Sequence, residues 1–103
     1  MNGTQMKLKG KHVRFLRGLG HHLQPFVMIG KEELSSQVIT ASNEALDTHE
    51  LIKVKLQDGC IMDRKDVATE LASATKSEIV QILGKTILLY RQAEKPIIEL
   101  PKK

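Results

Sequence analysis

The sequence is poor in aromatic residues, since its 103 positions hold no tryptophan, one tyrosine and two phenylalanines. A hydrophobic core built from this composition must be largely aliphatic. Modules that stack two or three bases on the aromatic rings of a sheet need more rings than this chain has. The scarcity therefore excludes multi-base stacking as the main way in which the chain holds a partner.

Cysteine and long apolar runs are also scarce. The single Cys60 excludes an intramolecular disulfide framework and fits a reducing compartment. It has no CxxC partner, and we interpret it as a loop thiol rather than a nucleophile. No apolar run approaches the roughly 18 residues of a membrane span, and the basic start lacks the apolar stretch of a signal peptide. We expect a cytoplasmic protein with no membrane partner.

Acidic residues are missing from the first 31 positions, which carry six of the sixteen Lys and Arg residues. The other 72 residues hold ten basic and twelve acidic side chains, so the net charge of +4 originates in this one stretch. Charge that is segregated in this way favours a partner with a negative surface, and nucleic acid is the first candidate.

The basic stretch is amphipathic when it is placed on a helix. An arc of about 100° that we expect to be buried collects Leu8, His12, Phe15, Leu16, Leu19 and Leu23. The opposite side collects the cations Lys7, Lys11, Arg14, Arg17 and His21. The alternative is an ordinary solvated face, but such faces usually mix charges in i,i+4 pairs. We expect the helix to end before Pro25, with Gly18 or Gly20 marking a bend or its end.

The later elements follow from hydrophobic period and turn residues. We expect strands at 25–29, 51–56, 78–83 and 86–91, with a short edge strand at 97–100. Ser35 or Ser36 can cap a second helix and Asp63 a third. The Gly84-Lys85 pair predicts a two-residue hairpin turn between the last two long strands.

The resulting order, α-β-α-β-α-β-β, predicts an α+β fold, a two-layer α/β sandwich with a mixed four-stranded sheet. Two strand–helix–strand units require parallel strands with right-handed crossovers, and the hairpin requires an antiparallel pair. At this length we expect one domain over residues 1–103, with flexible tails at 1–6 and 101–103.

Two further places can contact phosphate. Gly30 and Lys31 follow an apolar strand and precede a helix, where a close backbone approach, the helix dipole and a lysine charge coincide. Many ordinary turns share this pattern. Lys53 and Lys55 alternate with apolar residues and form a second candidate surface. Lysines on a strand also serve simply to prevent aggregation, and the sequence leaves these two alternatives open.

Nothing in the sequence argues for an enzyme. The adjacent His21 and His22 diverge, and no HxxxH or HExxH spacing supports a metal site. His49 beside Glu50 is the arrangement of an acid–base pair, although local structure is the commoner reason for it. No Ser/His/Asp set, P-loop or GxGxxG is present. We expect no metal, no cofactor and no small-molecule substrate.

Three blocks together resemble the CRM domain, the chloroplast RNA splicing and ribosome maturation domain, in its stand-alone bacterial YhbY-type form. They are RFLRGLGHHLQPFVMIGK, EALDTHELIKVKL and QILGKTILLYR, which span residues 14–91. The resemblance implies a fold like the C-terminal domain of bacterial translation initiation factor three, with strand order 1-2-4-3. It also implies binding to structured RNA and association with the precursor of the large ribosomal subunit.

The family's strand-to-helix turn is a GxxG loop similar to that of KH domains, which clamp the RNA backbone. Here it corresponds to Gly30-Lys31-Glu32-Glu33. The first glycine and the basic residue match, whereas Glu33 replaces the second glycine and brings a carboxylate that repels phosphate. The resemblance therefore transfers an RNA-binding role to Gly30 and Lys31 and not to Glu33.

Our hypothesis from the sequence is a monomeric, non-enzymatic RNA-binding protein that assists assembly of the large ribosomal subunit. The residues expected to contact RNA are Lys7, Lys11, Arg14, Arg17, His21, Gly30, Lys31, Lys53 and Lys55. One rival is a protein–protein adaptor whose basic face docks an acidic ribosomal or assembly-factor surface, a contact that nuclease treatment would leave intact. A small RNA-processing enzyme is the second rival, and no reactive group supports it.

Overall fold

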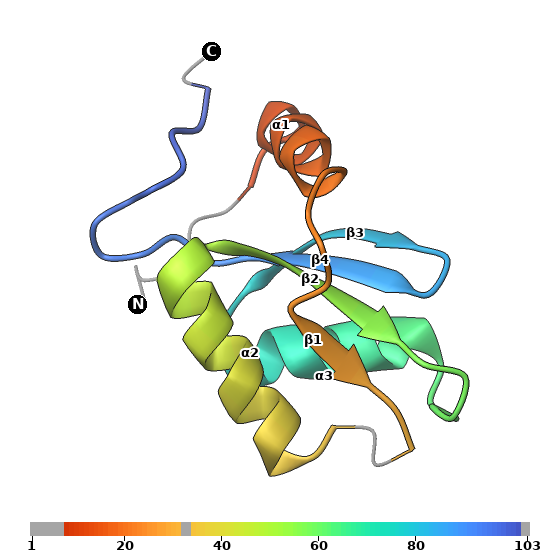
Figure 1. The fold of residues 1–103 in the computed structure, drawn as a ribbon. Coiled ribbons are helices and arrows are strands. Elements are labelled where there is room, and N and C mark those ends of the chain that lie inside the picture. The colour runs from red at the N-terminus through yellow and green to blue at the C-terminus, as the bar shows by residue number, and fades with distance from the viewer. Residues whose placement is uncertain (1–7, 32–33, 102–103) are drawn as a thin grey trace.

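The computed structural model describes residues 8–31 and 34–101. In these ranges the element order matches the predicted α-β-α-β-α-β-β (Figure 1). The elements are α1 (Gly10–Gly20), β1 (Val27–Ile29), α2 (Ser36–His49), β2 (Leu51–Leu56), α3 (Arg64–Thr75), β3 (Glu78–Leu83) and β4 (Thr86–Tyr90). The α+β class is confirmed, as is the end of the first helix at Gly20.

The four strands form one mixed sheet of order β1-β2-β4-β3, which confirms the order implied by the family resemblance. β1 and β2 are parallel and are joined through α2. β4 is antiparallel to both β2 and β3, so β2 and β3 run in the same direction with β4 between them. Neither edge strand is long and regular, because β1 has only three residues and the register of β3 shifts between Ile79 and Gln81.

The sheet is covered on both faces, so the molecule has a layer more than the expected two-layer sandwich. α2 and α3 enclose the main core, which includes Ile29, Leu46, Ile52 and Leu71. α1 lies on the other face of the sheet (Figure 1), where Leu16 packs in a second cluster with Leu51, Val80, Leu88 and Tyr90. The three-helix cover therefore places the basic helix apart from the other two.

Local chemistry explains where the elements begin and turn. The Ser35 hydroxyl accepts a hydrogen bond from the Val38 N–H at 3.2 Å and caps α2. The Asp63 carboxylate accepts one from the Lys65 N–H at the start of α3. Both predicted caps are confirmed. Gly84 has φ of +58° in the β3–β4 turn, a conformation that glycine adopts without strain.

A buried carboxylate holds the C-terminal segment in place. Glu50 is fully buried between α2 and β2, with φ of +65°. Its carboxylate oxygens accept hydrogen bonds from the N–H groups of Ala93, Ile97 and Ile98 at 2.6–2.9 Å. Three donors to one carboxylate satisfy a charge that would otherwise be costly to bury.

These contacts replace the expected edge strand at 97–100, and that prediction was wrong. The segment instead packs Ile98 and Leu100 against the second cluster. It reaches α1, where the His12 ring donates from Nε2 to the Pro101 carbonyl at 3.1 Å and accepts the Lys9 N–H at Nδ1. Pro101, which the sequence places in a tail, is thus bonded to the basic helix.

The buried stripe of α1 is narrower than the sequence predicted. His12, Leu16 and Gly20 are buried, but Phe15 and Leu19 are 38% and 40% exposed, so their predicted burial was wrong. The helix approaches the sheet closely at Gly20, where an added Cβ would lie 2.5 Å from a Leu88 methyl group. Close contact along one row of residues leaves the flanking side chains in solvent.

This contact predicts opposite effects for the same substitution at two glycines of α1. Gly18→Ala should raise the free energy of unfolding by about 0.5–1 kcal/mol, because alanine favours helix and no described atom lies within 4 Å of the new Cβ. Gly20→Ala should lower it by about 1–3 kcal/mol, because the buried Leu88 cannot swing away. Urea unfolding followed by circular dichroism measures both, and equal effects would contradict the docking of α1.

The only tyrosine carries a second prediction. The Tyr90 side chain is 1% exposed, and its hydroxyl has no hydrogen-bond partner in the described part of the chain. Burial, and secondarily the charge of Glu50, raises the pKa of Tyr90 to about 12 from 10.0. The unfolded chain therefore loses this proton first as the pH rises. Stability contributed by the protonated phenol is complete below pH 10 and is lost as the pH approaches 12.

The measurement is urea unfolding of the wild type and of Tyr90→Phe across that pH window. The variant is the reference, because the lysines that titrate in the same window affect both proteins alike. The wild type should lose stability more steeply than the variant. At neutral pH the variant should be at least as stable, since it removes a buried hydroxyl that has no partner. Parallel pH profiles for the two proteins would show that Tyr90 ionises normally.

Candidate nucleic-acid interface

The outer side of α1 presents basic side chains to solvent. Because Leu16 and Gly20 face the sheet, Arg14 and Arg17 project away from it and are exposed, and His21 is exposed directly after the helix. Arg17 also lies in the last turn, where the helix dipole favours a cation. These three members of the predicted cationic face therefore lie where a phosphate chain can reach them.

The N-terminal part of the predicted face is less open. Lys11 is half-buried and lines a hollow of about 390 Å³ together with Glu99 and Pro101 of the C-terminal segment. Because Glu99 lines the same hollow, an anion that approached Lys11 there would also meet a carboxylate. Lys7, the remaining predicted cation of this helix, lies outside the described residues.

The cations on the outer side of α1 are not neutralised by the protein's own acids in the described ranges. The two ion pairs there join Lys85 to Asp58 and Arg91 to Asp47. Arg91 is a structural residue, since its guanidinium also donates to the Asn43 and Thr75 carbonyl oxygens and so ties β4 to both α2 and α3. Arg14 and Arg17 take part in neither pair.

The predicted glycine turn lies at the end of a groove. This groove of about 420 Å³ runs between β1 and the first half of α2, and its walls include Phe26, Met28, Gly30, Lys31, Gln37 and Val38. Lys31 is exposed. The Gln57 side chain occupies the space beside Gly30, and its Oε1 would lie 2.7 Å from a Cβ added to the glycine. The glycine thus serves packing as well as backbone exposure. Glu33 lies outside the described residues.

The predicted lysines of β2 lie on the α1 face of the sheet, where Lys53 is half-buried and Lys55 exposed. Lys55 lines a hollow of about 530 Å³ with Met28, Asp58 and Lys85. The Lys85 hydrogen bond and charge, with a smaller contribution from Lys55, hold the pKa of Asp58 below its usual value of 3.8. Asp58 is therefore a carboxylate near neutral pH, and this hollow carries mixed charge.

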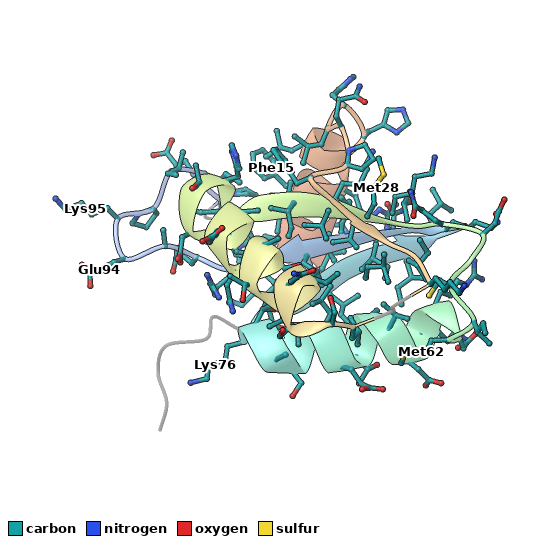
Figure 2. All side chains as sticks on the ribbon, turned by 60° about the horizontal axis from the view of Figure 1, so that its bottom comes forward. Phe15, Met28, Met62, Lys76, Glu94 and Lys95 are labelled. Carbon is teal, nitrogen blue, oxygen red and sulfur yellow. The ribbon has the colours of Figure 1, made fainter. Side chains whose placement is uncertain are left out.

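Met28 lines both the groove and the hollow, so Lys31 and Lys55 belong to adjoining cavities beside the edge strand β1. Figure 2 shows Met28 on β1 and Phe15 on α1 on the side of the sheet away from α3. In that view Met62 lies just before α3 and Lys76 directly after it. The residues 21–26 connect this region to α1 (Figure 1). The candidate interface thus has two parts, the α1 cations and the β1 edge.

Sequence reasoning missed the exposed side chains of β1. It treated residues 25–29 as one buried apolar run, whereas burial alternates and leaves Phe26 and Met28 43% and 54% exposed. The Phe26 ring stacks on His49 with ring centroids 4.3 Å apart and an interplanar angle of 25°. The two-residue period of a strand was the available signal, but only the edge position of β1 leaves that side uncovered.

The other reactive groups have structural roles or none that the fold reveals. His49 stacks on Phe26 while Glu50 points inward, so they do not form an acid–base pair. Cys60 is half-buried, with its Sγ 4.0 Å from the Met62 carbonyl. Within residues 8–31 and 34–101, no three His, Cys, Asp or Glu side chains are grouped as for a metal ion. In the same ranges, no helix has the length and apolarity that crossing a bilayer requires.

Comparison with known proteins gives concordant matches. A family model described as the CRS1 / YhbY (CRM) domain matches residues 8–91. The Probable RNA-binding protein YqeI of Bacillus subtilis is 43% identical over 95 residues, which are 91% of this chain and 99% of that protein. An RNA-binding protein of Haemophilus influenzae is 38% identical over 96 residues, covering 93% and 97% of the two chains.

A solved structure agrees with the fold. The solution structure of the hypothetical protein SAV1595 from Staphylococcus aureus superimposes with a TM-score of 0.78 at 40% sequence identity. The match covers 92% of this chain and 100% of that one. The overall fold of this chain therefore recurs in a protein whose structure has been determined independently.

Proposed function

The chain belongs to the CRS1/YhbY (CRM) domain family, and we propose that it is an RNA-binding protein that holds the backbone of structured RNA. The observation that carries this proposal is the exposure of Arg14 and Arg17 on a helix face with no acidic partner among the described residues. The names of the B. subtilis and H. influenzae relatives support the same partner.

Each part of the interface has a distinct task. Arg14, Arg17 and His21 attract phosphates over the outer side of α1, and contacts of this kind position a protein without reading sequence. Lys31 and Lys55 extend the contact to the β1 edge. Selectivity then comes from the shape of the RNA, since the charged groups must meet phosphates on two separate surfaces at once.

The cellular RNA we propose is ribosomal RNA in the precursor of the large subunit, where the protein acts in the cytoplasm as an assembly factor and as a monomer. The support is the family resemblance of the blocks spanning residues 14–91. No enzymatic step is part of this role. The alternative, an adaptor that docks an acidic protein, uses the same cations, whereas the B. subtilis and H. influenzae relatives are named as RNA-binding proteins.

An electrostatic interface predicts a strong dependence of affinity on salt. If about five phosphates are neutralised, the logarithm of the binding constant should fall against the logarithm of salt concentration with a slope of about −3 to −5. Fluorescence anisotropy with a labelled ribosomal RNA fragment over a potassium chloride series gives this slope. A slope near zero would contradict binding through Arg14 and Arg17 phosphate contacts.

A pair of charge-reversed variants locates the contacts. Arg14→Glu/Arg17→Glu should weaken binding severely and reduce the magnitude of the salt slope by about 2. The control Lys65→Glu/Lys95→Glu makes the same change in net charge on α3 and on the loop after β4, where Lys95 points into solvent (Figure 2). The control should keep the wild-type slope. Equal losses in both variants would mean that net charge rather than α1 governs binding.

The proposed partner is tested in cells by crosslinking the protein and sequencing the attached RNA. Reads should concentrate in large-subunit ribosomal RNA and its precursor, and the Arg14→Glu/Arg17→Glu variant should lose them. Reads spread over unrelated transcripts would overturn the ribosomal assignment while keeping RNA binding. Protein adducts without RNA would support the adaptor.

A further inference from the structure

The groove beside β1 contains a flat apolar surface that phosphate binding does not use. Phe26 is 43% exposed although it is one of only two phenylalanines in the chain. One face of its ring is covered by the imidazole of His49, at a centroid distance of 4.3 Å. The stack fixes the plane of the ring, so the ring is oriented before any ligand arrives.

The groove is limited in size and has a cationic end. Its volume of about 420 Å³ falls within the range of sites for small organic groups, and is too small to accept a double helix. Lys31 lies at one end, while Phe26 and Met28 supply apolar surface along the wall. A ligand that fits must combine a flat ring with a negative charge, which is the chemistry of a nucleotide.

We infer that this groove binds an unpaired nucleotide, whose base stacks on the Phe26 ring beside His49. The four residue steps from Phe26 to Gly30 span about 13 Å of extended chain. The phosphate that Gly30 and Lys31 contact therefore belongs to a neighbouring nucleotide of the same RNA strand. Bases within a duplex have both faces covered by their neighbours, and only an unstacked base can enter. The inference rests on the proposed RNA binding and adds a preference for a loop, bulge or end.

This assignment is compatible with the scarcity of aromatic residues. A single ring can accept one base, which contributes about 1–3 kcal/mol by substitution measurements on other proteins. The α1 cations then supply most of the affinity, and the groove decides which part of an RNA lies at the β1 edge. The two surfaces thus respond to different features of one RNA.

The test compares two RNAs with equal numbers of phosphates, a short unstructured oligoribonucleotide and a fully paired duplex. Phe26→Leu keeps an apolar side chain but removes the flat ring. It should weaken binding of the oligonucleotide by about five-fold to a hundred-fold and leave duplex binding unchanged. Phe15→Leu is the matched control, because it makes the same change at the other exposed phenylalanine and should alter neither affinity.

The outcomes separate this inference from the proposal on which it rests. If both RNAs bind with normal salt dependence and Phe26→Leu binds both as the wild type does, the groove assignment is overturned and RNA binding stands. Equal weakening by Phe26→Leu and Phe15→Leu also overturns it. If the wild type binds neither RNA, both conclusions fail. Circular dichroism and the melting temperature verify that each variant is folded.

Discussion

The buried carboxylate of Glu50 is the constraint on which the packing of the C-terminal segment and of α1 depends. A charge at 0% exposure is stable only when it is fully hydrogen-bonded, and here the donors are the backbone N–H groups of Ala93, Ile97 and Ile98. The backbone carbonyl oxygen of Glu50 also accepts a hydrogen bond from the Arg91 N–H. One side chain therefore fixes the path of the chain from the end of β4 onward.

That path determines how α1 sits. Ile98 and Leu100 pack against the second cluster, which contains Leu16 of α1. The Pro101 carbonyl oxygen accepts a hydrogen bond from the ring of His12, also in α1. The position of α1, and with it that of the exposed arginines, thus depends on Glu50 through the C-terminal segment. This connection also explains why Lys11 is less open than Arg14, since the C-terminal segment lies beside its end of the helix.

Much of the fold was predictable because its signals are local. Ser35, Asp63 and Gly84 act through bonds or dihedral angles within a few residues, and the strand order agreed with the family resemblance. The errors share a non-local cause. The helix wheel located the centre of the α1 stripe, but its width depends on how closely Gly20 meets Leu88.

The C-terminal segment has a strand-like sequence, and an extended chain becomes a strand only if another strand accepts its N–H groups. In this protein a carboxylate accepts them instead. The candidate site likewise has one part that the sequence predicts and one part that depends on the tertiary structure. The segregation of charge along the chain and the helix wheel predicted that Arg14 and Arg17 lie on an exposed face. The groove at Phe26 could not be predicted in this way, because it depends on β1 being an edge strand and on His49 lying beside it.

The short and irregular edge strands of the sheet affect whether copies of the protein associate with one another at high concentration. An exposed strand edge that carries apolar side chains invites pairing with another copy, and long flat edges are the most dangerous. Here β1 is three residues long, and β3 is distorted near Ile79. Neither edge offers a regular template for intermolecular hydrogen bonds. The protein can therefore leave Phe26 and Met28 exposed at this edge without offering a regular strand on which a second copy could pair.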